Sequence, residues 1–132
     1  MSDFSFIDNV SEVKSNETLT AFFTLKGNEE FLNEHFADFP VMPGVLQLES
    51  LRQAASRLLG ETEKKPSFYR LQSVSSAKYG QFVKPGGLLK IFVRLVKKED
   101  KIFHFEGRID LMHGGEKVGR VVAADFTLAP VR

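Results

Sequence analysis

The sequence contains no cysteine and no tryptophan among its 132 residues. The lack of cysteine excludes disulfides, thiolate nucleophiles and thiolate metal ligands, although it leaves the cellular compartment open. Only three histidines are present, and they are far apart in the chain. We therefore expect no metal site, because a structural zinc ion needs a cluster of histidine and cysteine ligands.

A large excess of charge of one sign is also missing. The net charge of +1 provides no general attraction to nucleic acid, and neither GxxxxGK nor GxGxxG occurs, so nucleotide binding has no support. No apolar stretch approaches the roughly 20 residues of a membrane span. The first ten residues, MSDFSFIDNV, lack the basic region and apolar run of a signal peptide. We expect a cytoplasmic protein without a membrane span or a nucleic-acid partner.

Phenylalanine, by contrast, is abundant, with 13 residues. This number indicates a core or pocket lined by rings without polar groups. The hydrophobic fraction of 42% and the charged fraction of 27% are ordinary for a globular domain. No repeat, low-complexity segment or linker divides the chain, so residues 1–132 are expected to form one domain.

One long helix is predicted from Gly44 to Leu59, with Gly60 as its stop signal. Apolar residues recur there at helical spacing: Val45, Leu48, Leu51, Ala55, Leu58 and Leu59. A short helix is expected to begin at residues 28–30, where an asparagine precedes two glutamates. A loop with two prolines follows, from His35 to Gly44.

The remaining segments are rich in β-branched and aromatic residues and predict strands. Their expected ranges are 4–13, 18–26, 67–79, 88–97, 101–112 and 117–128. Residues 99–100 and 113–115 are expected to form tight turns between the last three strands. The order is two strands, a main helix and four strands, which favours an α+β fold with an antiparallel sheet against one helix.

The start of the long helix gathers groups that carry chemistry. His35 lies in the loop just before it, and residues 41–43 offer no side chain that would cap the helix. The amides of Gly44 and Val45 therefore lack an obvious local partner and are suited to a carbonyl oxygen that gains negative charge. Gly44 also leaves room for close approach. Glu49 follows just over one turn later, so a base, an oxyanion site and a carboxyl group lie near one another.

These groups are the ones that β-elimination from a 3-hydroxyacyl thioester requires. A base takes a proton from the α carbon, hydrogen-bond donors stabilise the enolate-like oxygen, and an acid assists the departure of hydroxide. The reaction needs neither a metal nor an organic cofactor, so we expect none.

Residues 35–53, HFADFPVMPGVLQLESLRQ, resemble the signature of the 3-hydroxyacyl-acyl-carrier-protein dehydratases of bacterial fatty-acid synthesis. His35 matches the catalytic histidine of that family and Glu49 its catalytic glutamate. Gly44 matches the glycine whose amide polarises the thioester carbonyl. Residues 6–10 and 77–86 are similar to two further blocks, so the resemblance covers nearly the whole chain.

The resemblance implies a hotdog fold, in which a curled antiparallel sheet of five to six strands surrounds the long helix. It implies a homodimer, and possibly a larger assembly of dimers, with His35 of one chain facing Glu49 of the other. It also implies a substrate carried on the phosphopantetheine of an acyl carrier protein, in fatty-acid or related lipid or polyketide synthesis. Carrier proteins of this kind are acidic, so Lys78 and Lys84 are candidate contacts at the tunnel mouth.

Several positions depart from the family pattern. Ala37 replaces a proline, and the family's additional N-terminal segment is expected to be missing. Arg52 stands where the family prefers a small apolar residue, within pairing reach of Glu49. A fixed pair would lower the pKa of Glu49, weaken it as an acid, and make removal of Arg52 activating. We expect Arg52 to point away instead, because a buried charge pair costs desolvation energy. Gln53 is expected to support Glu49.

Two other functions stay open. A hotdog thioesterase would use Glu49 to activate water, whereas a non-catalytic hotdog protein would bind acyl chains or support a partner subunit. Arg52 and Ala37 are compatible with the second alternative. Tyr79 and Phe82 are expected in the core or the tunnel wall rather than in the chemistry.

Overall fold

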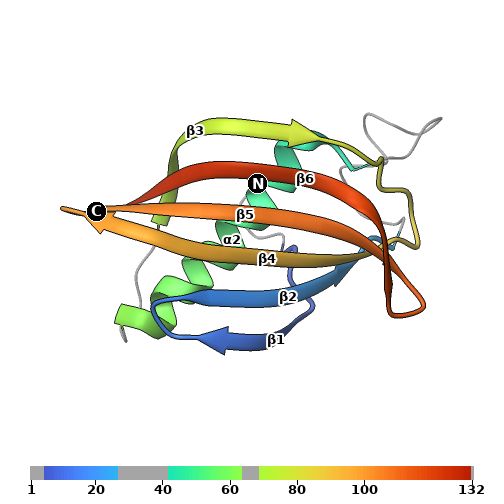
Figure 1. The fold of residues 1–132 in the computed structure, drawn as a ribbon, viewed down its shortest axis with the longest axis horizontal. Helices are drawn as coiled ribbons and strands as arrows, with labels where there is room; N and C mark the ends of the chain where they lie inside the picture. The colour runs from blue at the N-terminus through green and yellow to red at the C-terminus, as the bar shows by residue number, and fades with distance from the viewer. Residues whose placement is uncertain (1–4, 27–41, 64–68, 132) are drawn as a thin grey trace.

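The computed structural model describes residues 5–26, 42–63 and 69–131. In this part of the chain the elements are β1 (Asn9–Lys14), β2 (Thr18–Thr24), α2 (Gly44–Glu63), β3 (Tyr69–Tyr79), β4 (Leu88–Glu99), β5 (Ile102–His113) and β6 (Glu116–Pro130). The strands form one sheet in the order β1-β2-β4-β5-β6-β3, and each neighbouring pair is antiparallel. Figure 1 shows this sheet extending across α2. The predicted α+β fold is confirmed.

The strands alternate between a buried inner face and an outer face. In β4, Leu89, Ile91 and Val93 are fully buried, whereas the alternating Lys90, Phe92 and Arg94 lie on the other face. Phenylalanine rings fill much of the inner layer, as their number predicts. The buried rings include Phe6, Phe23, Phe103, Phe105 and Phe126.

Helix α2 packs a stripe of small and aliphatic side chains against that inner face. Leu51, Ala54, Ala55, Leu58 and Leu59 are all at most 1% exposed. This burial contributes the main driving force for docking the helix, since about 25 cal/mol is gained per Å² of apolar surface removed from water.

The predicted helix stop at Gly60 is wrong, because α2 continues to Glu63. A glycine ends a helix when it adopts a left-handed backbone conformation, and Gly60 is not among the glycines with positive φ. The buried Leu58 and Leu59 in the same turn offset the cost of about 1 kcal/mol that glycine carries inside a helix.

The two predicted hairpin turns are confirmed. Asp100 lies between β4 and β5 with φ of 60°, and Gly114 and Gly115 lie between β5 and β6 with φ of 60° and 86°. In the second turn, positive φ at both central residues matches the twist of the flanking strands. The expected short helix at residues 28–30 lies outside the described residues.

The first strand begins later than predicted, at Asn9 rather than residue 4. The amide of Phe6 donates to Oε1 of Gln53 at 2.7 Å instead of to a neighbouring strand. Its ring packs edge-to-face on Phe23 with centroids 5.5 Å apart. The segment before β1 is therefore attached to α2 by a side chain, a contact that local strand propensity does not indicate.

Candidate active site

The start of α2 is held by hydrogen bonds from both sides. The amide of Met42 donates to the carbonyl of Val83 at 2.9 Å. Nε2 of Gln47 donates to the carbonyl of Met42 at 3.2 Å, and Gln47 itself is 5% exposed. The residues before the helix are thus tied both to the loop after β3 and to the helix itself.

The first helical turn contains two backbone amides that have no intrahelical acceptor. The amides of Leu46 and Gln47 donate to the carbonyl of Pro43 at 3.0 and 3.1 Å. Within the described part of the chain, the amides of Gly44 and Val45 have no hydrogen-bond acceptor. The first turn also carries no acidic side chain. These amides and the positive end of the helix are available to an oxyanion.

Exposed apolar side chains surround this helix start. A Cβ atom at Gly44 would lie 2.9 Å from Cε1 of Tyr79, whose hydroxyl donates to the Gly44 carbonyl at 3.5 Å. Tyr79, Phe82 and Val45 are 52%, 65% and 71% exposed, so Tyr79 and Phe82 do not lie in the core, and their place in a tunnel wall stays a prediction. Grouped apolar exposure of this kind marks a binding or interaction surface.

The carboxylate of Glu49 is paired with Arg52 in a two-point contact. Nε of Arg52 donates to Oε1 at 2.9 Å, and Nη2 donates to Oε2 at 2.8 Å. The remaining terminal nitrogen, Nη1, donates to the carbonyl of Tyr69 at 2.8 Å. The prediction that Arg52 points away from Glu49 is therefore wrong. The planar guanidinium matches both carboxylate oxygens and also finds an acceptor on β3, which compensates for its partial burial.

Gln53 adds a third donor to the same carboxylate. Its Nε2 donates to Oε2 of Glu49 at 3.0 Å, while its Oε1 accepts from the Phe6 amide. The network therefore links the segment before β1, the helix and β3. The structure thus brings Gln53 to Glu49 as expected, whereas the contributions of Phe6 and Tyr69 have no signal in the local sequence.

Two opposing effects act on the pKa of Glu49. Burial of the carboxyl raises its pKa, whereas the hydrogen bonds from Arg52 and Gln53 and the positive charge of Arg52 lower it. The lowering effects prevail, so Glu49 is ionised at neutral pH. The hydrogen bond to Glu49 raises the pKa of Arg52, and the negative charge of Glu49 adds to this effect. Burial lowers the pKa of Arg52, but by less.

Gly44 and Glu49 occupy different sides of α2. Gly44 and Glu49 are five residues apart, which corresponds to about 140° around a helix of 3.6 residues per turn. Val45, four residues before Glu49, lies on nearly the same side as the carboxylate. One substrate carbonyl at the Gly44 amide would therefore not face Glu49 of the same chain directly.

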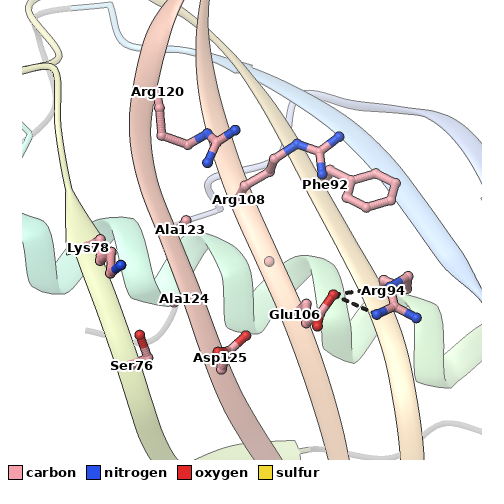
Figure 2. Close-up of a pocket in the computed structure, with 11 residues that line it drawn as sticks. Ser76, Lys78, Phe92, Arg94, Glu106, Arg108, Arg120, Ala123, Ala124 and Asp125 are labelled. Atoms are coloured by element: carbon pink, nitrogen blue, oxygen red, sulfur yellow. Dashed lines mark hydrogen bonds and ion pairs between the residues drawn. The ribbon is translucent and has the colours of Figure 1, made fainter.

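The other predicted site residues are placed as follows. His35 and Ala37 lie outside the described residues. Lys78 is exposed on the outer face of β3, beside a hollow of the sheet (Figure 2), and Lys84 is exposed in the loop between β3 and β4. The described residues contain no group of three or more histidines and carboxylates that could hold a metal ion. They also contain no helix that is both long and apolar enough to span a membrane.

Comparison with known proteins supports the dehydratase resemblance. The 3-hydroxyacyl-[acyl-carrier-protein] dehydratase FabZ of Lactobacillus helveticus is 42% identical over 100 residues, which are 74% of this chain and 66% of that protein. FabZ of Coxiella burnetii is 35% identical over 109 residues, 80% of this chain and 77% of the relative. The chain thus spans about two thirds of the length of the first FabZ relative.

The fold is also found among solved structures. A chain of the dehydratase heterocomplex ApeI:P from Xenorhabdus doucetiae superposes with a TM-score of 0.76, at 18% identity, over 96% of this chain and 83% of that one. The hotdog-fold prediction is confirmed. The profile of the ApeI-like dehydratases matches residues 11–116. With the order of elements, the helix start and the FabZ relatives in agreement, we conclude that the chain belongs to the ApeI-like family of dehydratases.

Proposed function

We propose that this protein is an enzyme that dehydrates 3-hydroxyacyl thioesters to trans-2-enoyl thioesters. The substrate is carried on the phosphopantetheine of an acyl carrier protein, in fatty-acid or related lipid or polyketide synthesis. The observation that carries the proposal is the helix start of α2. In a chain that belongs to a dehydratase family, it combines two free amides with a fixed carboxylate.

In the proposed reaction the amides of Gly44 and Val45 receive the thioester oxygen. His35 takes a proton from the α carbon, and the electrons of that C–H bond move toward the carbonyl, where the amides stabilise the negative charge. The C3–O bond then breaks as the α,β double bond forms. No cofactor takes part in this sequence of steps.

Glu49 is proposed to orient the departing hydroxyl group rather than to protonate it. An ionised carboxylate has about four lone-pair sites for hydrogen bonds. Arg52 and Gln53 occupy three of them, which leaves one site on Oε1 for the C3 hydroxyl of the substrate. Because Glu49 has no proton to give, the proton that His35 has taken is the one that converts the departing hydroxide into water.

The Gly44 amide and the Glu49 carboxylate face different sides of one helix. A composite site between two copies of the chain would bring them to the same substrate. The amides of one chain and Glu49 of the other would then face one substrate. The exposed Val45, Tyr79 and Phe82 at the helix start would be covered by such an interface. We propose a homodimer, active in the cytoplasm as one domain, with Lys78 and Lys84 as contacts for the carrier protein.

The proposed function is tested by incubating the protein with carrier-linked 3-hydroxyacyl thioesters of several chain lengths and identifying the products by mass spectrometry. The expected product is an enoyl thioester. It is about 18 Da lighter than the substrate, because elimination removes one water molecule. A free acid as the main product would contradict dehydration.

The ionised state of Glu49 favours one alternative, thioester hydrolysis. A carboxylate held by donors can accept a proton from water, which would attack the thioester carbonyl at the free amides. The same mass measurement separates this thioesterase activity from dehydration. Release of free thiol without an enoyl product would establish the alternative.

A further inference from the structure

A hollow of about 570 Å³ lies on the outer face of the sheet, across β3, β6, β5 and β4 (Figure 2). We call it the outer-face hollow. Its charged side chains are the four cations Lys78, Arg94, Arg108 and Arg120 and the two carboxylates Glu106 and Asp125. The lining side chains therefore carry an excess of two positive charges, which Asp110 behind Arg108 and Arg120 partly balances and Lys117 beside Asp110 restores.

The floor of the outer-face hollow is the small side chain of Ala123, which lies between Lys78 and Arg108. In the strand register, Lys78 of β3 pairs with Ala123 of β6, which pairs with Arg108 of β5. Side chains that are cross-strand neighbours point to the same face. The methyl group of Ala123 therefore leaves an open space with Lys78 on one side and Arg108 on the other, as Figure 2 shows.

Two arginines at this end are braced by one nearly buried carboxylate. Nε of Arg120 donates to Oδ1 of Asp110 at 3.1 Å, and Nε of Arg108 lies 3.7 Å from Oδ2. Asp110 is 8% exposed, and the Arg108 guanidinium lies 4.4 Å from the centre of the Phe92 ring. Both side chains are therefore held in place before any ligand binds, which reduces the entropy cost of binding.

The donors at the tips of these side chains remain available. Asp110 engages the arginines through Nε, and among the described residues the terminal nitrogens of Arg108 and Arg120 and Nζ of Lys78 have no hydrogen-bond acceptor. Forked guanidinium groups match the oxygen atoms of a phosphate. Unused, pre-positioned donors around an open space are the arrangement expected of an anion site.

The opposite end of the hollow has a different character. Arg94 is already engaged there, because its Nε and Nη2 donate to Oε1 of Glu106 at 3.2 and 2.7 Å. Asp125 lies directly opposite Glu106 in the register, and Ser76 lies opposite Asp125. The carboxylate of Asp125 and the hydroxyl of Ser76 are acceptors that suit hydroxyl groups of a ligand.

We propose that the outer-face hollow binds a small, hydroxyl-bearing phosphate monoester. Lys78, Arg108 and Arg120 bind the phosphate group, and Ser76 and Asp125 accept hydrogen bonds from the hydroxyl groups. A concave site with braced donors favours a small ligand over a flat protein surface. The site lies on the face of the sheet away from α2 and Glu49, so phosphate binding there is separate from the chemical step of the proposed dehydration, although Lys78 is shared with the proposed carrier contact.

The test uses the full chain and follows binding by isothermal titration calorimetry and backbone amide NMR shifts. The probes are glycerol 3-phosphate, inorganic phosphate and glycerol, at matched ionic strength. We expect saturable one-to-one binding of glycerol 3-phosphate, weaker binding of phosphate and none of glycerol. Arg120→Gln should weaken binding about tenfold or more, since it removes a charge-assisted donor. Arg57→Gln, an equal charge change on an exposed part of α2, should leave binding unchanged.

Asp110→Asn separates a built site from diffuse attraction. It makes the protein more positive, so non-specific attraction would strengthen, whereas loss of the brace weakens binding at a built site. Ala123→Leu fills the floor without changing charge and should abolish binding, which keeps the test decisive if Asp110→Asn does not fold. Absence of saturable binding, stronger binding by Asp110→Asn, or binding of an acidic carrier protein without binding of the phosphate probes would each overturn the proposal.

Discussion

Glu49 is the residue whose surroundings bear most directly on the chemistry. Arg52 and Gln53 provide three hydrogen bonds to its carboxylate, and Nη1 of Arg52 bonds to the carbonyl of Tyr69. An exposed pair of this spacing would contribute a few tenths of a kcal/mol. This pair is half-buried and linked to a second element, so its loss affects both the charge state and the direction of Glu49.

Arg52→Leu should reduce turnover, because the Glu49 carboxylate loses its orientation and burial then raises its pKa. On acidification, the variant should also lose its activity at a higher pH than the wild type does. If Glu49 instead acts as the acid, Arg52→Leu should raise turnover, so the direction of the change separates the two roles. The pH dependence of kcat is the measurement, and Arg52→Lys should recover part of the activity.

The same variant has a consequence for stability. In the wild type the pKa of Glu49 is lowered on folding, so the pair stabilises the protein above the ordinary pKa of 4.5 and loses its effect as the pH falls below it. Arg52→Leu should therefore lower the free energy of unfolding by about 1 to 3 kcal/mol at neutral pH, and less in acid. Urea unfolding at both pH values measures this, with Arg57→Leu as the control; equal losses for both variants would contradict it.

His35→Ala and Glu49→Gln should each reduce dehydration by about 100- to 10,000-fold, the range for groups that act directly on a proton or its acceptor. The glutamine retains the size of Glu49 but cannot provide an anionic acceptor. Glu61→Gln is a matched control, because Glu61 is exposed on the same helix. Circular dichroism should show an intact fold in all three; retained turnover in Glu49→Gln would remove Glu49 from the mechanism.

At the scale of elements, α2 joins the chemistry to the core. One side packs on the inner face of the sheet, while its first turn and Glu49 remain accessible. The hydrogen bond between Met42 and Val83 and the contact of Gly44 with Tyr79 place the helix start against the end of β3. The helix start is therefore attached to the sheet by tertiary contacts, and a fixed position of this kind suits an oxyanion site.

Gly60 provides a test of the helix itself. It lies inside α2, and a Cβ atom there would have no atom within 4 Å. Gly60→Ala should therefore raise the free energy of unfolding by about 0.5 to 1 kcal/mol, because alanine loses less backbone entropy on entering a helix. Urea unfolding monitored by circular dichroism measures the change. A decrease would mean that Gly60 ends the helix after all.

At the scale of the whole molecule, two copies of the chain should share each site. His35→Ala and Glu49→Gln homodimers should both be inactive, but a mixed dimer has one site with both changes and one with neither. Random exchange of the two mutants should restore up to about a quarter of wild-type turnover in a two-fold dimer. Subunit exchange is verified by native mass spectrometry, and exchange without recovery would place both residues in one chain or outside a shared mechanism.

The carrier protein gives a second prediction at this scale. Lys78→Glu with Lys84→Glu should weaken turnover of carrier-linked substrate and spare a short pantetheine thioester, because only the carrier presents an acidic surface. Equal losses on both substrates would contradict the contact. Arg120→Gln serves as a comparison, since it alters the outer-face hollow without changing either lysine. A loss of turnover that Arg120→Gln also shows would point to the hollow rather than to a carrier contact of Lys78.

The order of the elements and the family could be predicted from the amino-acid sequence. Alternation in the strands, the helical spacing from Gly44 onward and the motif at residues 35–53 are local patterns, and local patterns determine which segments form strands and helices. The absence of a capping side chain before Gly44 could also be predicted, because the start of a helix depends on a few neighbouring residues.

The direction of Arg52 and the end of α2 depend instead on tertiary contacts. Arg52 pairs with Glu49 because the Tyr69 carbonyl of β3 accepts its third nitrogen, and Gly60 stays helical because Leu58 and Leu59 pack on the sheet. The brace of Arg108 and Arg120 on Asp110 likewise depends on the register of β5 and β6. Each of these outcomes depends on contacts between segments far apart in the chain, and such contacts have no signature in local sequence.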